Sequence, residues 1–133
     1  MKRLAYFALS LVLLFTAIIP FTSVSAAPNS APSVIPAIRD WQGSNGSFAV
    51  NSSTALVNLA SSDSVSKVKG YFSDMLGLEL SVKSASSGSN EIIFKKDASL
   101  AASVGNEGYR LEATSSKITI TAATEIGLLY GGI

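Results

Sequence analysis

Acidic and aromatic side chains are the groups in this sequence whose positions suggest chemistry. Asp40 directly precedes Trp41, and such a pair can hold a sugar by stacking on the indole and hydrogen bonding to the carboxylate. Glu107 and Glu112 flank a short alternating segment that contains Tyr109. We favour a plainer interpretation, in which the two rings pack in a core or against another domain and the acids are solvated, because aromatic burial is common. We therefore assign no catalytic residue here.

Cysteine and histidine are both absent from the 133 residues. Within this segment, their absence excludes a Cys or Ser nucleophile paired with His, and it excludes the usual Cys/His zinc sites. An exported domain without cysteine must also hold together by burial alone, without disulfides. We expect no cofactor-binding and no metal-binding residue in this segment.

Residues 1–26 have the composition of a secretory signal peptide. Lys2 and Arg3 give a positive start, residues 4–19 are apolar apart from one Ser and one Thr, and Val24-Ser25-Ala26 supplies the small-x-small pattern read by signal peptidase. The apolar run is shorter than the ~20 residues that a membrane span requires, which makes a membrane anchor the less favoured alternative. We predict cleavage after Ala26 and a secreted, extracytoplasmic protein with no stable membrane span.

The rest of the chain is expected to form one small domain over residues 34–133. Residues 27–33 are small, polar and proline-containing, which favours a flexible lead. The chain carries 10 Lys and Arg against 9 Asp and Glu, so no basic patch argues for a nucleic-acid partner. Asn45-Gly46-Ser47 and Asn51-Ser52-Ser53 match the N-glycosylation acceptor pattern, but turns use Asn and Ser so commonly that we favour two ordinary turns.

Residues 62–76 carry the clearest helical pattern. Ser62 or Asp63 can cap the start, Gly77 follows the end, and the apolar stripe comprises Val65, Val68, Phe72, Met75 and Leu76. Gly70 inside this helix should cost about 1 kcal/mol relative to Ala, and a close approach to a sheet would explain it. A second helix is predicted to begin after Thr124, and its apolar pattern reaches Ile133 without a cap. We therefore expect that the chain is truncated at residue 133.

Short apolar or alternating runs predict the strands. They cover residues 47–50, 55–59, 78–83, 91–95, 109–114 and 117–122. The run Ile92-Ile93-Phe94 indicates burial on both faces, whereas Leu78, Leu80 and Val82 alternate as in a half-buried strand. Only Ser115-Ser116 separates the last two runs, which predicts a hairpin without the glycine that such turns prefer.

Several segments follow one another in the order seen in one known module. They are Val34-Ile35-Pro36 with Trp41, Gly46-Ser47-Phe48, Asn106-Glu107-Gly108-Tyr109-Arg110-Leu111, Ile118-Thr119-Ile120-Thr121-Ala122 and Gly127-Leu128-Leu129-Tyr130-Gly131. In this order they resemble the N-terminal domain of glycoside hydrolase family 20, the β-N-acetylhexosaminidases. The resemblance covers residues 34–133.

The resemblance implies an α+β fold, with a mostly antiparallel sheet and helices packed on one face. It implies a partner as well, because in this family the domain packs beside a (β/α)8 barrel that carries the chemistry. The parent would remove terminal N-acetylglucosamine or N-acetylgalactosamine from glycans or chitin fragments. The substrate's acetamido oxygen replaces the enzyme nucleophile, and an Asp-Glu pair in the barrel assists it. No position of this chain matches that pair, and the mechanism needs no cofactor.

The favoured function is therefore a non-catalytic N-terminal domain of a secreted β-N-acetylhexosaminidase, inactive by itself. The alternatives are a stand-alone secreted carbohydrate-binding or cell-surface module, the front domain of a different glycosidase, or a structural fragment without activity. Sugar binding by residues 27–133 alone would favour the binding module.

Overall fold

The computed structural model describes residues 27–34 and 37–133, so the predicted signal peptide lies outside the described residues. The chain falls into two units, one that ends at Asn45 and one that comprises Gly46–Ile133. The described part of the first unit contains no helix or strand. Two hydrogen bonds connect Asn29 to later residues of this unit. The Asn29 N–H donates to the Ser44 oxygen at 2.8 Å, and the Trp41 indole N–H donates to the Asn29 oxygen at 3.1 Å. The flexible lead at 27–33 stays a prediction.

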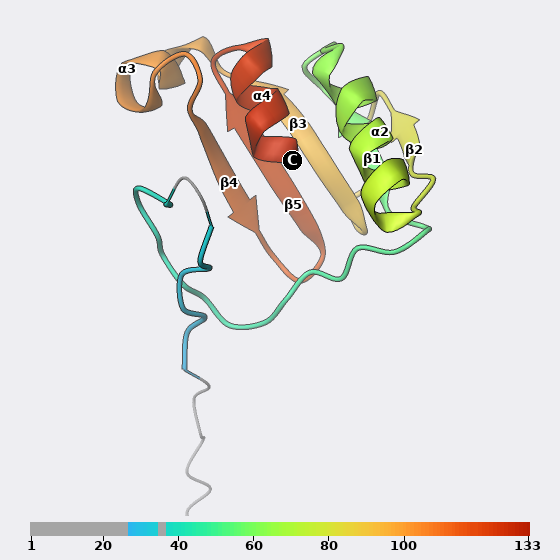
Figure 1. Cartoon of the computed structure of the whole chain (residues 1–133), viewed down its shortest axis with the longest axis horizontal. Helices are drawn as coiled ribbons and strands as arrows, with labels where there is room; N and C mark the ends of the chain where they lie inside the picture. The colour runs from blue at the N-terminus through green and yellow to red at the C-terminus, as the bar shows by residue number, and fades with distance from the viewer. Residues whose placement is uncertain (1–26, 35–36) are drawn as a thin grey trace, which may run out of the picture. The chain divides into compact units, whose positions relative to one another are not determined.

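The second unit holds a five-stranded sheet, with helices α2 and α4 on one face (Figure 1). The strand order is β2-β1-β3-β5-β4. Among the described residues, no helix is long and apolar enough to cross a bilayer. In chain order the elements are β1 (Ala55–Asn58), α2 (Ser64–Leu76), β2 (Ser81–Lys83), β3 (Glu91–Lys96), the 3-10 turn η1 (Ala98–Leu100), α3 (Ala101–Val104), β4 (Tyr109–Ala113), β5 (Lys117–Ala122) and α4 (Glu125–Gly132).

The predicted α+β class is confirmed, but the prediction of a mostly antiparallel sheet is wrong. β1 pairs in parallel with β2 and with β3, and β3 pairs in parallel with β5. Only the β4–β5 pair is antiparallel. The connections explain this result, because α2 returns the chain from β1 to the start of β2, and the loop at 84–90 then crosses β1 to reach β3. Crossovers of this kind restart each strand in the same direction.

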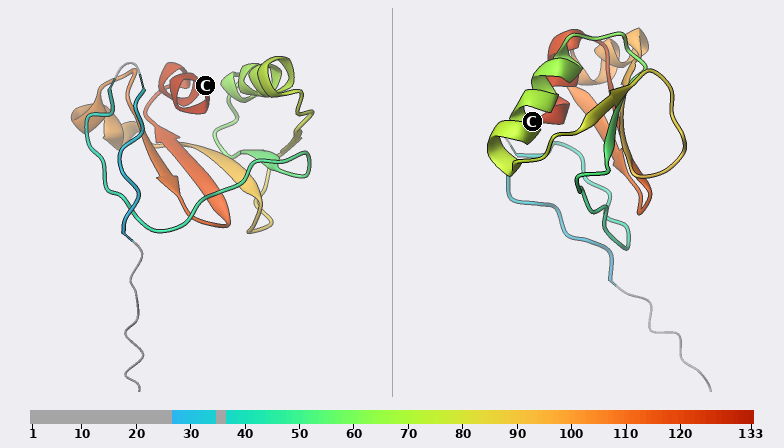
Figure 2. Two further views of the ribbon diagram at one scale, coloured as in Figure 1. Left: turned by 60° about the horizontal axis from the view of Figure 1, so that its bottom comes forward. Right: turned by 90° about the vertical axis from the view of Figure 1, so that its right-hand side faces the viewer.

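The two crossovers lie on opposite faces of the sheet. Figure 2 shows the loop at 84–90, drawn in yellow, on the side away from α2 and α4. The main core lies on the helix side and comprises Leu56, Val65, Val68, Leu80, Ile92, Phe94, Ile120, Ala122 and Leu128. Val57 and Ile93 lie opposite each other on the other face and are also buried. The burial of β3 on both faces is therefore confirmed.

One predicted strand is absent and another is shorter than expected. Residues 47–50 form no strand, although Phe48 and Val50 pack against the core. Of residues 78–83, only Ser81–Lys83 pair as β2, and Val82 is exposed at this edge of the sheet. Leu80 is buried as predicted.

The predicted end of α2, the predicted start of α4 and the hairpin are confirmed, whereas the side chain of Asp63, which precedes α2, makes no capping hydrogen bond. Gly77 ends α2 in a left-handed conformation (φ 65°), and the Thr124 hydroxyl accepts the Gly127 N–H at the start of α4. The hairpin turn needs no glycine because neither Ser115 nor Ser116 adopts a positive φ. The Thr114 hydroxyl stabilises the turn by accepting the N–H groups of Ser116 and Lys117 at 3.3 and 3.1 Å.

Glycines in α4 allow this helix to pack closely. A Cβ placed on Gly131 would lie 2.6 Å from the Ile120 methyl, and one on Gly132 would lie 2.6 Å from a Val68 methyl. Gly70 of α2 is different, since a Cβ there would meet no atom within 4 Å. The proposed explanation of Gly70 by a close approach is therefore wrong.

Candidate functional site

The residues that the sequence suggested for sugar binding do not form an enclosed site. Asp40, Glu107 and Glu112 are exposed, and Trp41 is 47% exposed. Tyr109 is 41% exposed, with one side of its ring against α4, where a Cβ on Gly131 would lie 3.0 Å from the ring. Across residues 27–34 and 37–133, no group of three or more acidic side chains comes close enough to hold a metal ion.

Glu91 is the most completely buried charged group of the described chain. Its residue is 0% exposed at the start of β3, beneath the loop at 84–90. The hydroxyls of Ser86 and Ser87 donate to its carboxylate at 2.5 and 2.6 Å, and the Ser87 N–H donates at 2.8 Å. The Gly88 N–H adds a longer bond at 3.2 Å. The carboxylate therefore fixes the loop to the face of the sheet opposite the helices.

These donors change the acidity of Glu91. The Ser86 hydroxyl, followed by the hydroxyl and N–H of Ser87, lowers the pKa of Glu91 to about 2, although burial acts in the opposite direction. The nearest cation is the Lys83 ammonium, 4.0 Å away. Nothing in the sequence pattern singles out Glu91, since its partners come from an irregular serine-rich loop whose path is set by the crossover.

A second carboxylate joins both helices to the sheet at the opposite end of β3. The Glu125 carboxylate, in the first turn of α4, accepts the hydroxyl of Ser62 and the ammonium of Lys96, the latter at 3.0 Å. The Ser64 hydroxyl donates to the Glu125 backbone oxygen at 2.8 Å. The Ser62 hydroxyl, followed by the Lys96 ammonium, lowers the pKa of Glu125. The network holds the N-termini of α2 and α4 together.

Removal of the Ser62 hydroxyl tests this network. Ser62 is buried, and its hydroxyl also accepts the Ser64 N–H at 3.1 Å, so Ser62→Ala removes one hydrogen bond from the Glu125 carboxylate and one from the Ser64 N–H. We expect a loss of about 1–3 kcal/mol in the free energy of unfolding, measured by urea denaturation. Ser66→Ala is the matched control, because Ser66 is exposed on the same helix. Equal effects of the two substitutions would contradict the proposed role of the network.

The outer side of α4 carries apolar side chains in place of polar ones. Ile126 and Tyr130 are each 43% exposed, and Ile133, just after the helix, is 64% exposed. Their spacing of four and three residues places them on one side of a helix. We call these three residues the α4 stripe. On α2, Tyr71 and Met75 are likewise exposed and four residues apart. Apolar rows of this kind are typical of a surface that another part of a protein covers.

Comparison with known proteins places this fold in a family. A sequence profile described as "Glycosyl hydrolase family 20, domain 2" matches residues 31–132. The chain is 26% identical over 104 residues to a lacto-N-biosidase of Bifidobacterium bifidum, a match that covers 75% of this chain and 9% of that protein. It is also similar to the structure of the GH20 β-N-acetylhexosaminidase from Streptomyces coelicolor A3(2), with a TM-score of 0.62 and 28% identity.

The structural match covers 80% of this chain and 21% of the Streptomyces chain, so this chain spans only a small part of either relative. The resemblance found in the order of the sequence motifs is confirmed by all three comparisons. Because the family profile covers most of its length, the chain belongs to glycosyl hydrolase family 20, as domain 2 of that family.

Proposed function

We propose that this chain is the non-catalytic N-terminal domain of a secreted β-N-acetylhexosaminidase. In this proposal a barrel elsewhere in a longer protein releases terminal N-acetylglucosamine or N-acetylgalactosamine, and the present domain supports that barrel. The observation that carries the proposal is the match of residues 31–132 to domain 2 of family 20. This chain spans only a small share of each relative, which is consistent with catalysis by another part of a longer protein.

The chemistry belongs to the absent part in this proposal. Family 20 is a substrate-assisted family, in which the acetamido group of the sugar acts as the nucleophile and the enzyme supplies acid-base and orienting groups. Such work needs acidic side chains gathered in one place. The two carboxylates with the most hydrogen bonds, Glu91 and Glu125, are both engaged with serines and lysines of their own fold. We assign them to folding and not to catalysis.

The α4 stripe is the surface that we assign to contact with the barrel. Ile126, Tyr130 and Ile133 together present apolar area that a second domain could bury. Burial of such side chains gains roughly 1.5–3 kcal/mol each when it is complete. The contact would hold the domain in a fixed position beside the catalytic part.

A glycosidase of different specificity is the second candidate. It is favoured by one observation, the similarity to a lacto-N-biosidase, a protein named for a different substrate from that of the Streptomyces relative. The two candidates share the same role for this chain and differ only in the sugar that the longer protein releases.

An activity assay on two proteins tests the proposal. A longer protein that carries this chain should hydrolyse a chromogenic N-acetylglucosaminide, and the 133-residue chain should not. If the longer protein hydrolyses only a chromogenic lacto-N-bioside, the second candidate replaces the first. Hydrolysis by the 133-residue chain itself would overturn the non-catalytic role.

The double variant Ile126→Lys/Tyr130→Lys tests the contact with the barrel. In the longer protein we expect it to lower the free energy of unfolding by at least about 2 kcal/mol, because two charges would enter an apolar contact. In the 133-residue chain it should change stability by less than about 1 kcal/mol, since both side chains are exposed there. Leu59→Lys, an exposed position outside the helices, is the control. Equal effects of the double variant in both proteins would contradict the assignment.

A further inference from the structure

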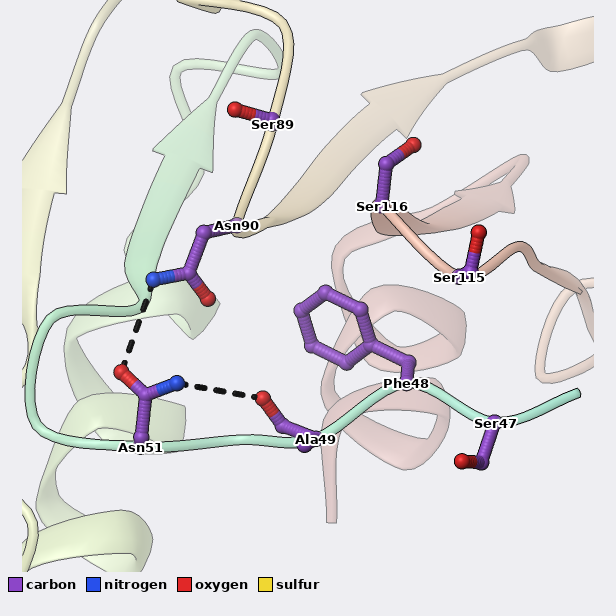
Figure 3. A pocket seen from close by; sticks show the side chains of 8 residues that line it. All are labelled: Ser47, Phe48, Ala49, Asn51, Ser89, Asn90, Ser115 and Ser116. Atoms are coloured by element: carbon purple, nitrogen blue, oxygen red, sulfur yellow. Dashed lines mark hydrogen bonds between the residues drawn. The ribbon is translucent and has the colours of Figure 1, made fainter.

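A shallow pocket lies at the end of the sheet where β1 and β3 begin, at the opposite end from Glu125. Three separate segments form it, which are the chain before β1, the end of the loop at 84–90, and the β4–β5 turn (Figure 3). Its volume is about 420 Å³. The lining residues are Ser47, Phe48, Ala49, Asn51, Ser89, Asn90, Ser115 and Ser116.

Hydrogen bonds within the protein hold the three segments around the pocket in place. The Asn90 side-chain amide accepts the Thr54 hydroxyl at 2.8 Å and donates to the Ser53 hydroxyl at 2.9 Å. The Asn90 N–H donates to the Ser116 oxygen at 2.7 Å, which ties the loop at 84–90 to the hairpin turn. Asn90 adopts a positive φ of 54°, a conformation that Asn tolerates better than most residues. The three segments are therefore fixed relative to one another before anything binds.

The lining of the pocket is uncharged and hydroxyl-rich. None of the eight residues is acidic or basic. Among the described residues, the side chains of Ser47, Ser89 and Ser115 have no protein hydrogen-bond partner and are exposed. The ring of Phe48 is half-buried and lies at the centre of the pocket, between Asn90 and the two serines of the hairpin turn (Figure 3). The pocket thus offers one half-buried aromatic ring and, at its margin, three exposed serine side chains.

We propose that this pocket binds one neutral sugar unit of a glycan, at a site separate from the catalytic site of the longer protein. A pyranose has an apolar C–H face that can lie on an aromatic ring and hydroxyls that can exchange hydrogen bonds with serines. The pocket volume is within the range of small-molecule sites. An anion would find no cation in the lining, and a cation would find no carboxylate. The choice of a glycan as ligand rests on the proposed function.

An NMR titration of the purified 133-residue chain with N,N′-diacetylchitobiose tests the site. We expect weak binding, with a dissociation constant on the order of 1 mM, because the pocket is shallow and open. Amide shifts should be confined to residues 47–51, 89–90 and 115–116. No shifts at concentrations up to roughly 20 mM, or shifts elsewhere only, would overturn the proposal.

Ser115→Glu is the variant that should block the site. Ser115 has no side-chain hydrogen bond to lose among the described residues, and the glutamate adds bulk and charge at the pocket wall. We expect binding to weaken at least tenfold, while a well-dispersed spectrum shows that the variant still folds. Ser84→Glu is the control, since Ser84 is exposed and lies outside the lining. Unchanged binding by Ser115→Glu would sink the proposal. Phe48→Ala is avoided because Phe48 also packs against the core.

The outcome is separable from that of the proposed function. Hydrolysis of a chromogenic monosaccharide substrate by the longer protein should be unaffected by Ser115→Glu, because the pocket is not the catalytic site. If the unsubstituted longer protein fails to hydrolyse any such substrate, the proposed function fails while the titration still decides the pocket. If Ser115→Glu abolishes that hydrolysis, the claim of a separate site is wrong.

Discussion

Gly127→Ala should lower the free energy of unfolding by about 2–4 kcal/mol. A Cβ at this position would lie 2.6 Å from the backbone oxygen of Gly108 and 2.8 Å from the Ala122 methyl, distances that real contacts do not reach. The helix would have to shift away from the sheet, and overpacking of this kind typically costs 1–3 kcal/mol. The same shift would weaken the cap that the Thr124 hydroxyl makes with the Gly127 N–H, a further loss of about 1 kcal/mol. Urea denaturation followed by circular dichroism measures the effect.

Gly70→Ala is the matched control for this prediction. It makes the same chemical change inside a helix, but a Cβ there meets nothing within 4 Å. We expect it to stabilise the protein by about 0.5–1 kcal/mol, because alanine restricts the unfolded chain and favours the helix. The two substitutions should therefore act with opposite signs. Destabilisation by Gly70→Ala, or a neutral Gly127→Ala, would contradict the packing described for the two helices.

Glu91→Gln should be the most damaging of the conservative charge changes, with a loss of about 3 kcal/mol at pH 7. Burial would be unchanged, but an amide cannot accept hydrogen bonds at both ends as the carboxylate does from Ser86, Ser87 and Gly88. A pKa lowered from 4.5 to about 2 corresponds to a stabilisation of that order. The loop at 84–90 should loosen, and proteolysis within this loop would report it.

The same carboxylate gives a pH dependence with a definite sign. Because the pKa of Glu91 is lower in the folded protein than in the unfolded chain, its stabilisation is complete above about pH 5 and is lost as the pH falls toward 2. Glu91→Gln should flatten this part of the stability profile. Glu112→Gln is the control, since Glu112 is an exposed residue of β4 whose loss should change stability by less than about 0.5 kcal/mol. Identical profiles for the original protein and Glu91→Gln would contradict the assignment.

The elements that the sequence predicts well are those encoded locally. Gly77 and Thr124 mark helix ends through backbone conformation and capping, effects that act within one turn. The hairpin was likewise predictable, because two alternating runs lie only two residues apart. In each case the neighbours in sequence supply the stabilising contacts.

Strand direction depends on connections and was not predictable in the same way. The expectation of an antiparallel sheet came from the family resemblance, yet the uninterrupted Ile92-Ile93-Phe94 run already indicated a strand buried on both faces, as in parallel sheets. A helix between β1 and β2 also favours a parallel pair. Both signals are present in the sequence and favour parallel pairing.

The polar networks show the limit of sequence reasoning more clearly. The sequence marks Ser62 only as a candidate cap, and Glu125 is an acidic residue in the first turn of a helix, as at many helix starts. Their contact joins residues 63 positions apart, and it forms because α2 and α4 both begin at the end of the sheet where β3 ends. Glu91 gave no signal at all. Contacts of this type follow from topology and can be seen only after the fold is known.

The position of β1 has a consequence for how the domain opens. Both edges of this four-residue strand are paired, α2 covers it on one face and the loop at 84–90 crosses it on the other, so that Leu56 and Val57 are each 0% exposed. If α2 alone or the loop at 84–90 alone moved away from the sheet, β1 would still be covered on its other face and paired at both edges. Its amide hydrogens should therefore exchange with solvent only when the whole unit unfolds, whereas the exposed edge strand β4 can fray locally. β1 should therefore lose its hydrogen bonds only when the whole unit unfolds.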